Sequence, residues 1–170
     1  MLNPICFKVI EIDWIKPLKI VDNVFIDEII VENLKEELSE IKSQHLLYQI
    51  YGFSPIYGNN SLLYIGKTIR PPENRIIEHS LSKFSRVLNM TIVIGEVEFF
   101  DNSVNYLEIA ESILITLTKP SYNSKNIDNI LQIAKDDNYL IINKNNRGVL
   151  PLECSNIWWN YDKYVIKSHE

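Results

Sequence analysis

Apolar and polar residues follow two different periods along the middle of the chain. Residues 46–53 (LLYQIYGF) and 62–68 (LLYIGKT) are rich in aromatic, leucine and β-branched side chains, and the connector 54–61 (SPIYGNNS) is rich in Pro, Gly and Asn. This pattern predicts a β-hairpin with a long loop. Residues 91–100 (TIVIGEVEFF) predict a third strand.

Two segments beside these strands have helical spacing instead. Residues 70–88 open with two prolines that suit a first helical turn and then place apolar residues on one side: Ile76, Ile77, Leu81 and Phe84. Residues 102–123 predict a helix that ends near Pro120, with these residues facing inward: Leu107, Ala110, Ile113, Leu114 and Leu117. The order β-β-α-β-α predicts an α/β (α+β) sandwich in which a small three-stranded antiparallel sheet is flanked by helices.

The remaining residues are predicted as extensions of this unit. Residues 1–45 contain short apolar runs, read as short strands or a helical turn, and an amphipathic helix over 33–43 with Asn33 as its cap. Residues 126–137 predict a helix, and 138–153 a hairpin turned at Asn145–Gly148. An aromatic tail with Trp158 and Trp159 is expected to pack back onto the domain. The resulting division is 1–45, 46–126 and 127–170.

Charge is unevenly distributed along the chain. The net charge is −5, and residues 1–45 carry five lysines against nine acidic residues. Residues 61–90 carry five basic residues against two acidic ones, so a local basic face can still meet phosphate. Cys6 and Cys154 lie far apart without metal-ligand spacing. Together with the lack of a long apolar run, this predicts a cytoplasmic protein with no signal peptide or membrane span.

The predicted layout brings a set of polar residues together: Tyr48, Tyr64, Gly66, Lys67, Arg75, His79, Glu111 and Asn123. Arg75 and His79 are four residues apart and share one helix face. The set contains no second carboxylate for a glycosidase pair, no nucleophilic Ser or Cys beside a base, and no Gly-rich phosphate loop. The set does contain cationic groups that can bind anionic oxygens and one carboxylate that can bind a hard cation. Its phenols and imidazole can transfer protons. This combination favours metal-assisted phosphodiester hydrolysis.

These residues resemble the signature of the GIY-YIG endonuclease family. Tyr64-Ile65-Gly66 followed by Lys67 is similar to the nuclease domain of the bacterial excision-repair C subunit, and Leu46-Leu47-Tyr48 stands where Gly, an aliphatic residue and Tyr are expected. Tyr51 is a rival for the first tyrosine. The Arg75-x-x-x-His79 spacing resembles the restriction-enzyme branch, and a helical Glu111 followed by P-x-Y-N at Asn123 resembles the end of the family's motif. The resemblance covers 46–123 only.

The resemblance implies a role for each matching residue. Glu111 would bind Mg²⁺ or Mn²⁺, and Tyr48 or Tyr64 would deprotonate the attacking water, with a pKa lowered by Lys67 or Arg75. Arg75 would also stabilise the charge on the phosphorus, His79 would orient a tyrosine or the water, and Asn123 would brace backbone or phosphate.

Gly66 and three further residues are assigned to the substrate, which the resemblance implies to be DNA. Gly66 would let a phosphate approach, and Arg70, Lys83 and Arg86 are predicted to contact the phosphate backbone. The protein is expected to act as a monomer or homodimer. The alternative function is a non-cleaving module that binds nucleic acid or protein and retains the fold.

Overall fold

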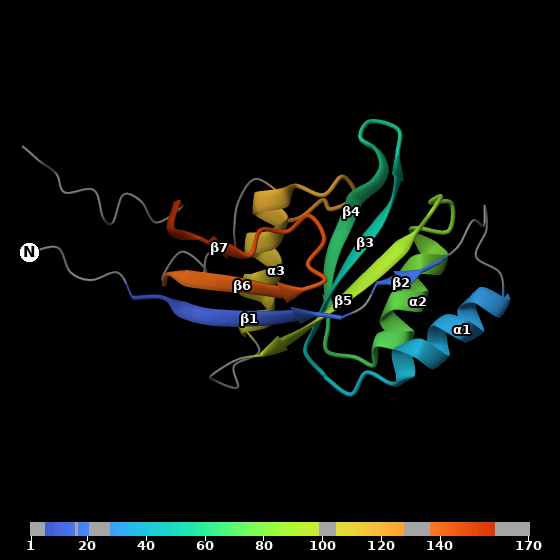
Figure 1. The fold of residues 1–170 in the computed structure, drawn as a ribbon, viewed down its shortest axis with the longest axis horizontal. Helices are drawn as coiled ribbons and strands as arrows, with labels where there is room; N and C mark the ends of the chain where they lie inside the picture. Colours follow the sequence, from blue (N-terminus) through green and yellow to red (C-terminus); the bar gives the residue numbers. More distant parts are fainter. Residues whose placement is uncertain (1–5, 16, 21–27, 99–104, 128–136, 159–170) are drawn as a thin grey trace, which may run out of the picture.

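The computed structural model describes residues 6–15, 17–20, 28–98, 105–127 and 137–158. Within them, three helices accompany one seven-stranded mixed sheet, which curls strongly into a half-barrel (Figure 1). The strands are β1 (Lys8–Trp14), β2 (Leu18–Lys19), β3 (Leu46–Ser54), β4 (Gly58–Thr68), β5 (Thr91–Glu98), β6 (Tyr139–Asn145) and β7 (Glu153–Ser155). The helices are α1 (Glu28–Ser39), α2 (Pro72–Ser82) and α3 (Asn105–Thr118).

The predicted antiparallel strands form the part of the sheet that carries the candidate site. Strand β3 lies between β4 and β5 and pairs antiparallel with both. In this register Tyr48 lies opposite Gly66 on β4 and opposite Ile94 on β5. The β-hairpin and the third strand are therefore confirmed.

The prediction that the sheet has only three strands is wrong. Strand β1 pairs antiparallel with the free side of β5, β6 pairs parallel with β1, and β7 and β2 add short pieces. The residues of β1 that face the core, Ile10, Ile12 and Trp14, are fully buried. Both flanking segments thus complete the sheet of the central unit, because β5 is buried on both faces and would otherwise expose an unpaired edge.

The hairpin is also tighter than its sequence suggests. Pairing continues to Ser54 opposite Gly58, so only 55–57 lie between the two strands, where a long loop over 54–61 was expected. The Ser54 hydroxyl accepts hydrogen bonds from the N–H groups of Ile56 and Tyr57, and Gly58 has a positive φ of 82°. This turn chemistry lets Asn59 and Asn60 extend the strand.

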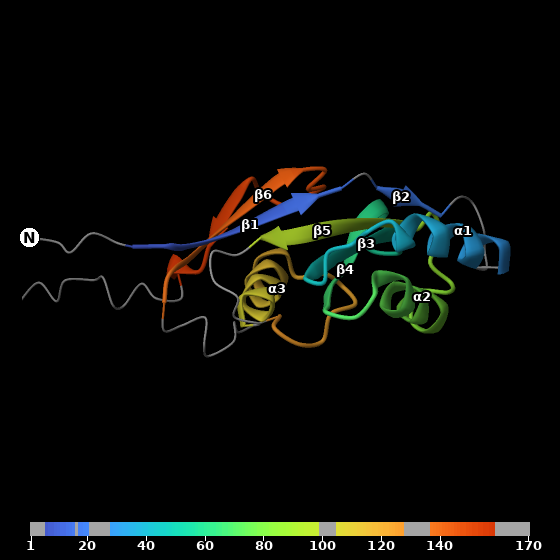
Figure 2. The same cartoon turned by 90° about the horizontal axis from the view of Figure 1, so that it is seen from below.

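Each face of the sheet has its own core. Helices α1 and α2 lie side by side (Figure 2) and cover one face, where Tyr48, Ile50 and Ile94 pack with Ile76 of α2. Helix α3 covers the other face, which includes Ile65. Alternating strand residues therefore point toward different helices, which decides which polar side chains can meet.

Two details of the helices differ from expectation. Helix α1 begins at Glu28, so Asn33 is an exposed helical residue and not the cap; Leu34 and Leu38 are buried as the spacing requires. In α3, Leu107, Ala110, Ile113 and Leu114 are buried, while Leu117 is 39% exposed because it lies in the last turn beyond the packed face.

The C-terminal predictions are met in part. The hairpin is confirmed as β6 and β7. The predicted helix over 126–137 falls mostly outside the described residues, as does Trp159 of the aromatic tail. Trp158 is 74% exposed and does not pack back onto the domain as predicted.

Candidate active site

Two tyrosines from neighbouring strands face α2 together. Tyr48 lies on β3 and Tyr64 on β4, with ring centroids 5.9 Å apart. Tyr48 is fully buried, whereas Tyr64 keeps partial contact with solvent. The rival Tyr51 points to the opposite face, where its hydroxyl accepts the N–H of Val149 at 3.1 Å. The structure therefore groups Tyr48 with Tyr64 and separates Tyr51 from them.

Gly66 has a packing role that the sequence did not reveal. A Cβ built on it would lie 2.6 Å from the Tyr48 hydroxyl oxygen and 2.6 Å from the Tyr64 ring. Sequence reasoning expected the glycine to admit a phosphate, but the Tyr48 side chain fills the space where a Cβ would lie. Because glycine has no side chain, the Tyr48 and Tyr64 rings can both lie over the backbone at this position of β4.

We expect Gly66→Ala to destabilise the protein by about 1–3 kcal/mol, because the new methyl overpacks a filled site. The methyl should also displace Tyr48. The activity of the site should therefore fall by a larger factor than the fraction of folded protein does. Gly58→Ala is the control: it strains a positive φ of 82° in the same hairpin, and its Cβ meets nothing within 4 Å. Thermal melts and activity assays should find both variants destabilised and only Gly66→Ala inactivated. Equal activity in the two would refute this role.

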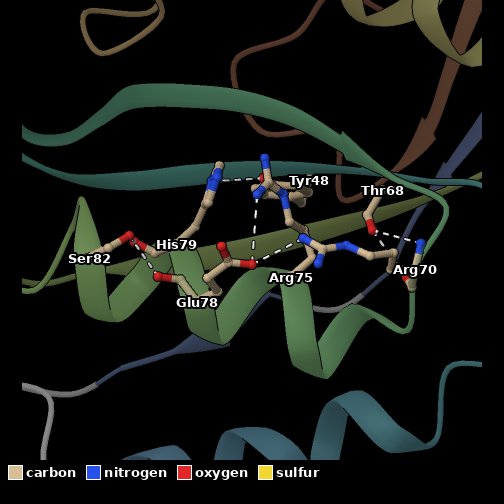
Figure 3. Close-up of polar contacts among 7 residues, drawn as sticks. All are labelled: Tyr48, Thr68, Arg70, Arg75, Glu78, His79 and Ser82. Carbon is tan, nitrogen blue, oxygen red and sulfur yellow. Dashed lines mark hydrogen bonds and ion pairs between the residues drawn. The ribbon is translucent and has the colours of Figure 1, made fainter.

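Helix α2 brings an imidazole to the tyrosine pair. Pro71 precedes the helix and Pro72 stands in its first turn, where a missing N–H costs nothing. The Tyr48 hydroxyl and His79 Nδ1 lie 3.0 Å apart (Figure 3). The His79 ring also stacks edge-on against Tyr64, with centroids 5.6 Å apart. Phenol, phenol and imidazole thus form one contiguous cluster.

The direction of the tyrosine pKa shifts corrects an expectation from the sequence. Burial raises the pKa of Tyr48 far above the ordinary phenol value and raises that of Tyr64 as well, and the nearby Arg75 only partly opposes this effect. The pKa of His79 is lowered, first by burial and then by Arg75. At neutral pH the tyrosines therefore keep their protons and the imidazole is neutral. In the tautomer whose proton is on Nε2, Tyr48 donates the hydrogen bond to His79 Nδ1.

Arg75 is the positive charge that acts on every group of the cluster. Its guanidinium lowers the pKa of each of four groups: Tyr48, Tyr64, His79 and Glu111. Its side chain is 29% exposed and lies 3.9 Å from a Glu78 oxygen, a distance too long for a tight ion pair. A guanidinium that is near four polar groups and held tightly by none of them is free to bind an incoming anion.

Glu111 reaches this cluster from α3. Burial raises the pKa of Glu111 to about 7, with Glu108 adding to the effect, while Lys67 and Arg75 oppose it. The backbone N–H of Lys67 also lowers the pKa of Glu111. Glu111 in turn raises the pKa of both Tyr48 and Tyr64, so its charge acts on the tyrosine pair. A carboxylate in this setting gains from an added cation.

Lys67 does not lie with the tyrosines. Strand alternation turns its side chain toward α3, where its ammonium forms an ion pair with Glu108. Sequence reasoning missed Glu108, although it lies one helical turn before Glu111 and so on the same face. The Lys67 side chain thus binds Glu108 of α3 and not the tyrosine pair.

Asn123 covers the open edge of β4. Its side-chain oxygen accepts the N–H of Ile65 at 3.0 Å, and its side-chain nitrogen donates to the carbonyl of Ile65 at 2.8 Å. The N–H of Tyr122 donates to the carbonyl of Leu63 at 2.8 Å. Asn123 was expected to bind either backbone or phosphate, and the structure shows it bound to backbone. These hydrogen bonds satisfy N–H and carbonyl groups of β4 that would otherwise be unpaired at the edge of the sheet.

The residues expected to contact phosphate lie in different surroundings. Arg70 is exposed before α2 and pairs with Glu78 at 3.0 Å (Figure 3). Arg86 is exposed on the turn after α2. Lys83 is exposed as well, but its ammonium donates to the carbonyl of Tyr122 at 2.6 Å and lies 4.6 Å from the centre of the Tyr64 ring.

Metal binding at this site would depend on ligands from outside the protein. No group of three or more His, Cys, Asp or Glu side chains gathers as a metal cage within the described residues. The partly buried Glu111 carboxylate is a hard oxygen donor, and Mg²⁺ commonly binds through one or two carboxylates together with waters and substrate oxygens. The donor set therefore fits a cation that completes its shell with substrate.

Comparison with known proteins does not extend these observations. Searches of protein-family models, curated protein sequences and solved structures find no match. None of the helices in the described residues has the length and apolar character needed to cross a membrane.

Proposed function

We propose that this chain is a metal-dependent endonuclease that hydrolyses DNA phosphodiester bonds by a GIY-YIG type of mechanism. One observation carries the proposal: β3, β4 and α2 bring two phenols and an imidazole into contact, and the charges of the Arg75 guanidinium and the Glu111 carboxylate act on them. Perturbed pKa values at such a cluster are typical of functional sites. The order of these groups along the chain also supports the GIY-YIG resemblance over 46–123.

The general base in this proposal is the hydrogen-bonded pair of Tyr48 and His79. Since burial holds Tyr48 in its protonated form, a free phenolate is disfavoured. The attacking water gives a proton to the Tyr48 oxygen as Tyr48 passes its own proton to His79 Nδ1, 3.0 Å away. The water oxygen forms a bond to phosphorus, the bond from phosphorus to the leaving sugar oxygen breaks, and that oxygen takes a proton from solvent. Tyr64, beside Tyr48, orients the water.

Arg75 and Glu111 stabilise the charge in this scheme. The Arg75 guanidinium binds the non-bridging phosphate oxygens and becomes more strongly bound as negative charge builds on them. Glu111 would hold the divalent cation, which supplies positive charge to the phosphate when it is bound. Arg70 and Arg86, exposed on either side of α2, suit contacts to neighbouring phosphates.

The direct test is incubation of the purified protein with supercoiled plasmid and Mg²⁺. We expect nicked or linear product, none in the presence of EDTA, and none from a Tyr48→Phe variant, which keeps the ring packing and removes the hydroxyl. Retained DNA binding without cleavage under any of Mg²⁺, Mn²⁺ or altered pH would instead support the non-cleaving module.

The pH dependence follows from Glu111 and His79. Glu111 must be deprotonated to bind a cation, and its pKa is about 7, raised by burial and Glu108. His79 must be neutral, and its pKa lies below the ordinary value of 6.5. We expect the cleavage rate to rise with pH around 7 at low Mg²⁺, and this midpoint to move to lower pH as Mg²⁺ increases, because the cation competes with the proton. A rate that falls across this range would contradict the assignment.

A further inference from the structure

The backbone on both sides of Tyr64 is held by one short segment. Before it, the carbonyl of Leu63 accepts the N–H of Tyr122 at 2.8 Å. After it, the Asn123 side chain binds both the N–H and the carbonyl of Ile65, at 3.0 and 2.8 Å. The segment that ends α3 therefore fixes the strand at the two residues that flank this tyrosine.

Lys83 joins this segment to the ring of the same tyrosine. Its ammonium donates to the Tyr122 carbonyl at 2.6 Å and stands 4.6 Å from the centroid of the Tyr64 ring. The Phe84 ring contacts both tyrosine rings, with centroid distances of 5.4 Å to Tyr64 and 5.5 Å to Tyr122. One cation thus contacts both the face of an aromatic ring and the segment that holds the backbone of that ring.

The position of Lys83 on the chain makes this contact a link between two helices. Lys83 is the C-cap of α2, and its N–H donates to the carbonyl of His79 at 2.9 Å. The ammonium end therefore ties the end of α2, one turn beyond the imidazole, to the segment that follows α3. Lys83 as a residue is exposed, and the partial burial of its ammonium lowers its pKa.

We propose that Lys83 is a positioning residue for Tyr64, and that it does not bind the phosphate backbone as its charge suggested. This inference rests on the proposed function and deepens it. Lys83 holds the Tyr64 ring by a cation–π contact and fixes the carbonyl of Tyr122, so that Tyr64 keeps its place beside Tyr48 and His79. Loss of the ammonium should loosen Tyr64 without removing any group that touches the substrate.

The test compares Lys83→Met, Lys83→Arg and the control Lys125→Met. Lys125 is an exposed lysine two residues after Asn123 and outside the site. We expect Lys83→Met to lower the single-turnover rate at saturating DNA about tenfold, because misplacing a reacting group costs rate even when the substrate is bound. The KM and the salt dependence of DNA binding should stay as in wild type. Lys83→Arg, which keeps both charge and cation–π contact, should restore most of the rate, and Lys125→Met should match wild type.

Two outcomes would overturn the positioning role. One is an unchanged saturated rate together with a salt slope reduced by about 1, the signature of a lost phosphate contact. The other is a Lys83→Met protein that equals Lys125→Met in every measurement.

A second readout does not depend on activity. Amide hydrogen exchange at Tyr122 and Ile65 should accelerate in Lys83→Met and not in Lys125→Met, because the ammonium fixes the segment that protects both amides. If wild type cleaves no DNA, the proposed function fails, and the exchange data still decide whether Lys83 holds this segment. Unchanged exchange at both amides would refute the link itself.

Discussion

Glu111→Gln is expected to abolish cleavage and at the same time to make the protein more stable above pH 7. The carboxylate would be the protein's anchor for the cation, and an amide oxygen binds a divalent cation far more weakly. The stability gain has a separate cause, which is burial. The pKa of Glu111 is about 7 in the folded protein against an ordinary value of 4.5, so the folded state binds this proton more tightly than the unfolded state does.

The sign of the stability effect follows from that difference. Between pH 4.5 and 7 the folded state carries more of the Glu111 proton than the unfolded state, so stability falls as pH rises through this window. A glutamine has no proton to lose and escapes this fall. We expect a gain on the order of 1–3 kcal/mol at pH 8 and a much smaller one at pH 5. Thermal melts at the two pH values and a plasmid-nicking assay measure both effects.

Glu108→Gln is the matched control, since Glu108 stands one helical turn before Glu111 on the same face. Glu108 is about half exposed and pairs with the Lys67 ammonium on the surface. Its loss should change stability by less than about 1 kcal/mol, as for other surface ion pairs, and should leave most of the cleavage. A Glu111→Gln protein that is destabilised but active would mean that Glu111 is a structural partner and that the proposed cation site is wrong.

Local patterns predict the central part of the fold well. The period-two alternation in β3 and β4 depends only on residues close together in the sequence. The same is true of the helical spacing and the prolines at the start of α2. The face that each residue buries follows directly from these periods. For the same reason, Tyr48 and Tyr64 could be placed on one face, and Arg75 and His79 on one side of their helix.

Pairing between distant segments could not be predicted in this way. Strand β1 meets β6 in parallel, with Lys8 opposite Tyr139, and no turn joins the two strands or sets their register. The curled sheet therefore comes from partners that are far apart in sequence, which short-range periodicity does not report. Residues 1–45 and 127–170 were predicted to be extensions because each apolar run was interpreted without a pairing partner.

The electrostatics of the site were harder to predict than its members. Sequence reasoning placed Arg75 near the tyrosines and expected it to lower their pKa, and it does act in that direction. The net shift is upward because burial is the larger effect, and burial depends on packing by α1 and α2. Lys67 was expected to act on the tyrosines because it follows Tyr64-Ile65-Gly66 in the motif, whereas strand alternation turns its side chain toward Glu108.

The last expectation concerns Arg75, whose replacement by alanine should lower the cleavage rate at saturating DNA by a hundredfold or more. That factor corresponds to about 3 kcal/mol of transition-state stabilisation, typical of a group that faces developing negative charge. The fold should persist, because the Arg75 side chain is 29% exposed and 3.9 Å from its nearest carboxylate oxygen. The residual activity should also require higher pH, since Arg75 lowers the pKa of both His79 and Glu111.

Arg70→Ala separates catalysis by Arg75 from simple attraction of DNA. Both arginines approach the same Glu78 oxygen, Arg70 at 3.0 Å and Arg75 at 3.9 Å, so both variants remove one positive charge from the same surface. Arg70→Ala should weaken binding modestly and reduce the salt slope by about 1, with the saturated rate within a few-fold of wild type. Arg75→Lys should recover little, because a lysine cannot bind two phosphate oxygens in a planar fork. Equal losses of saturated rate in Arg70→Ala and Arg75→Ala would show that Arg75 has no special place in the reaction.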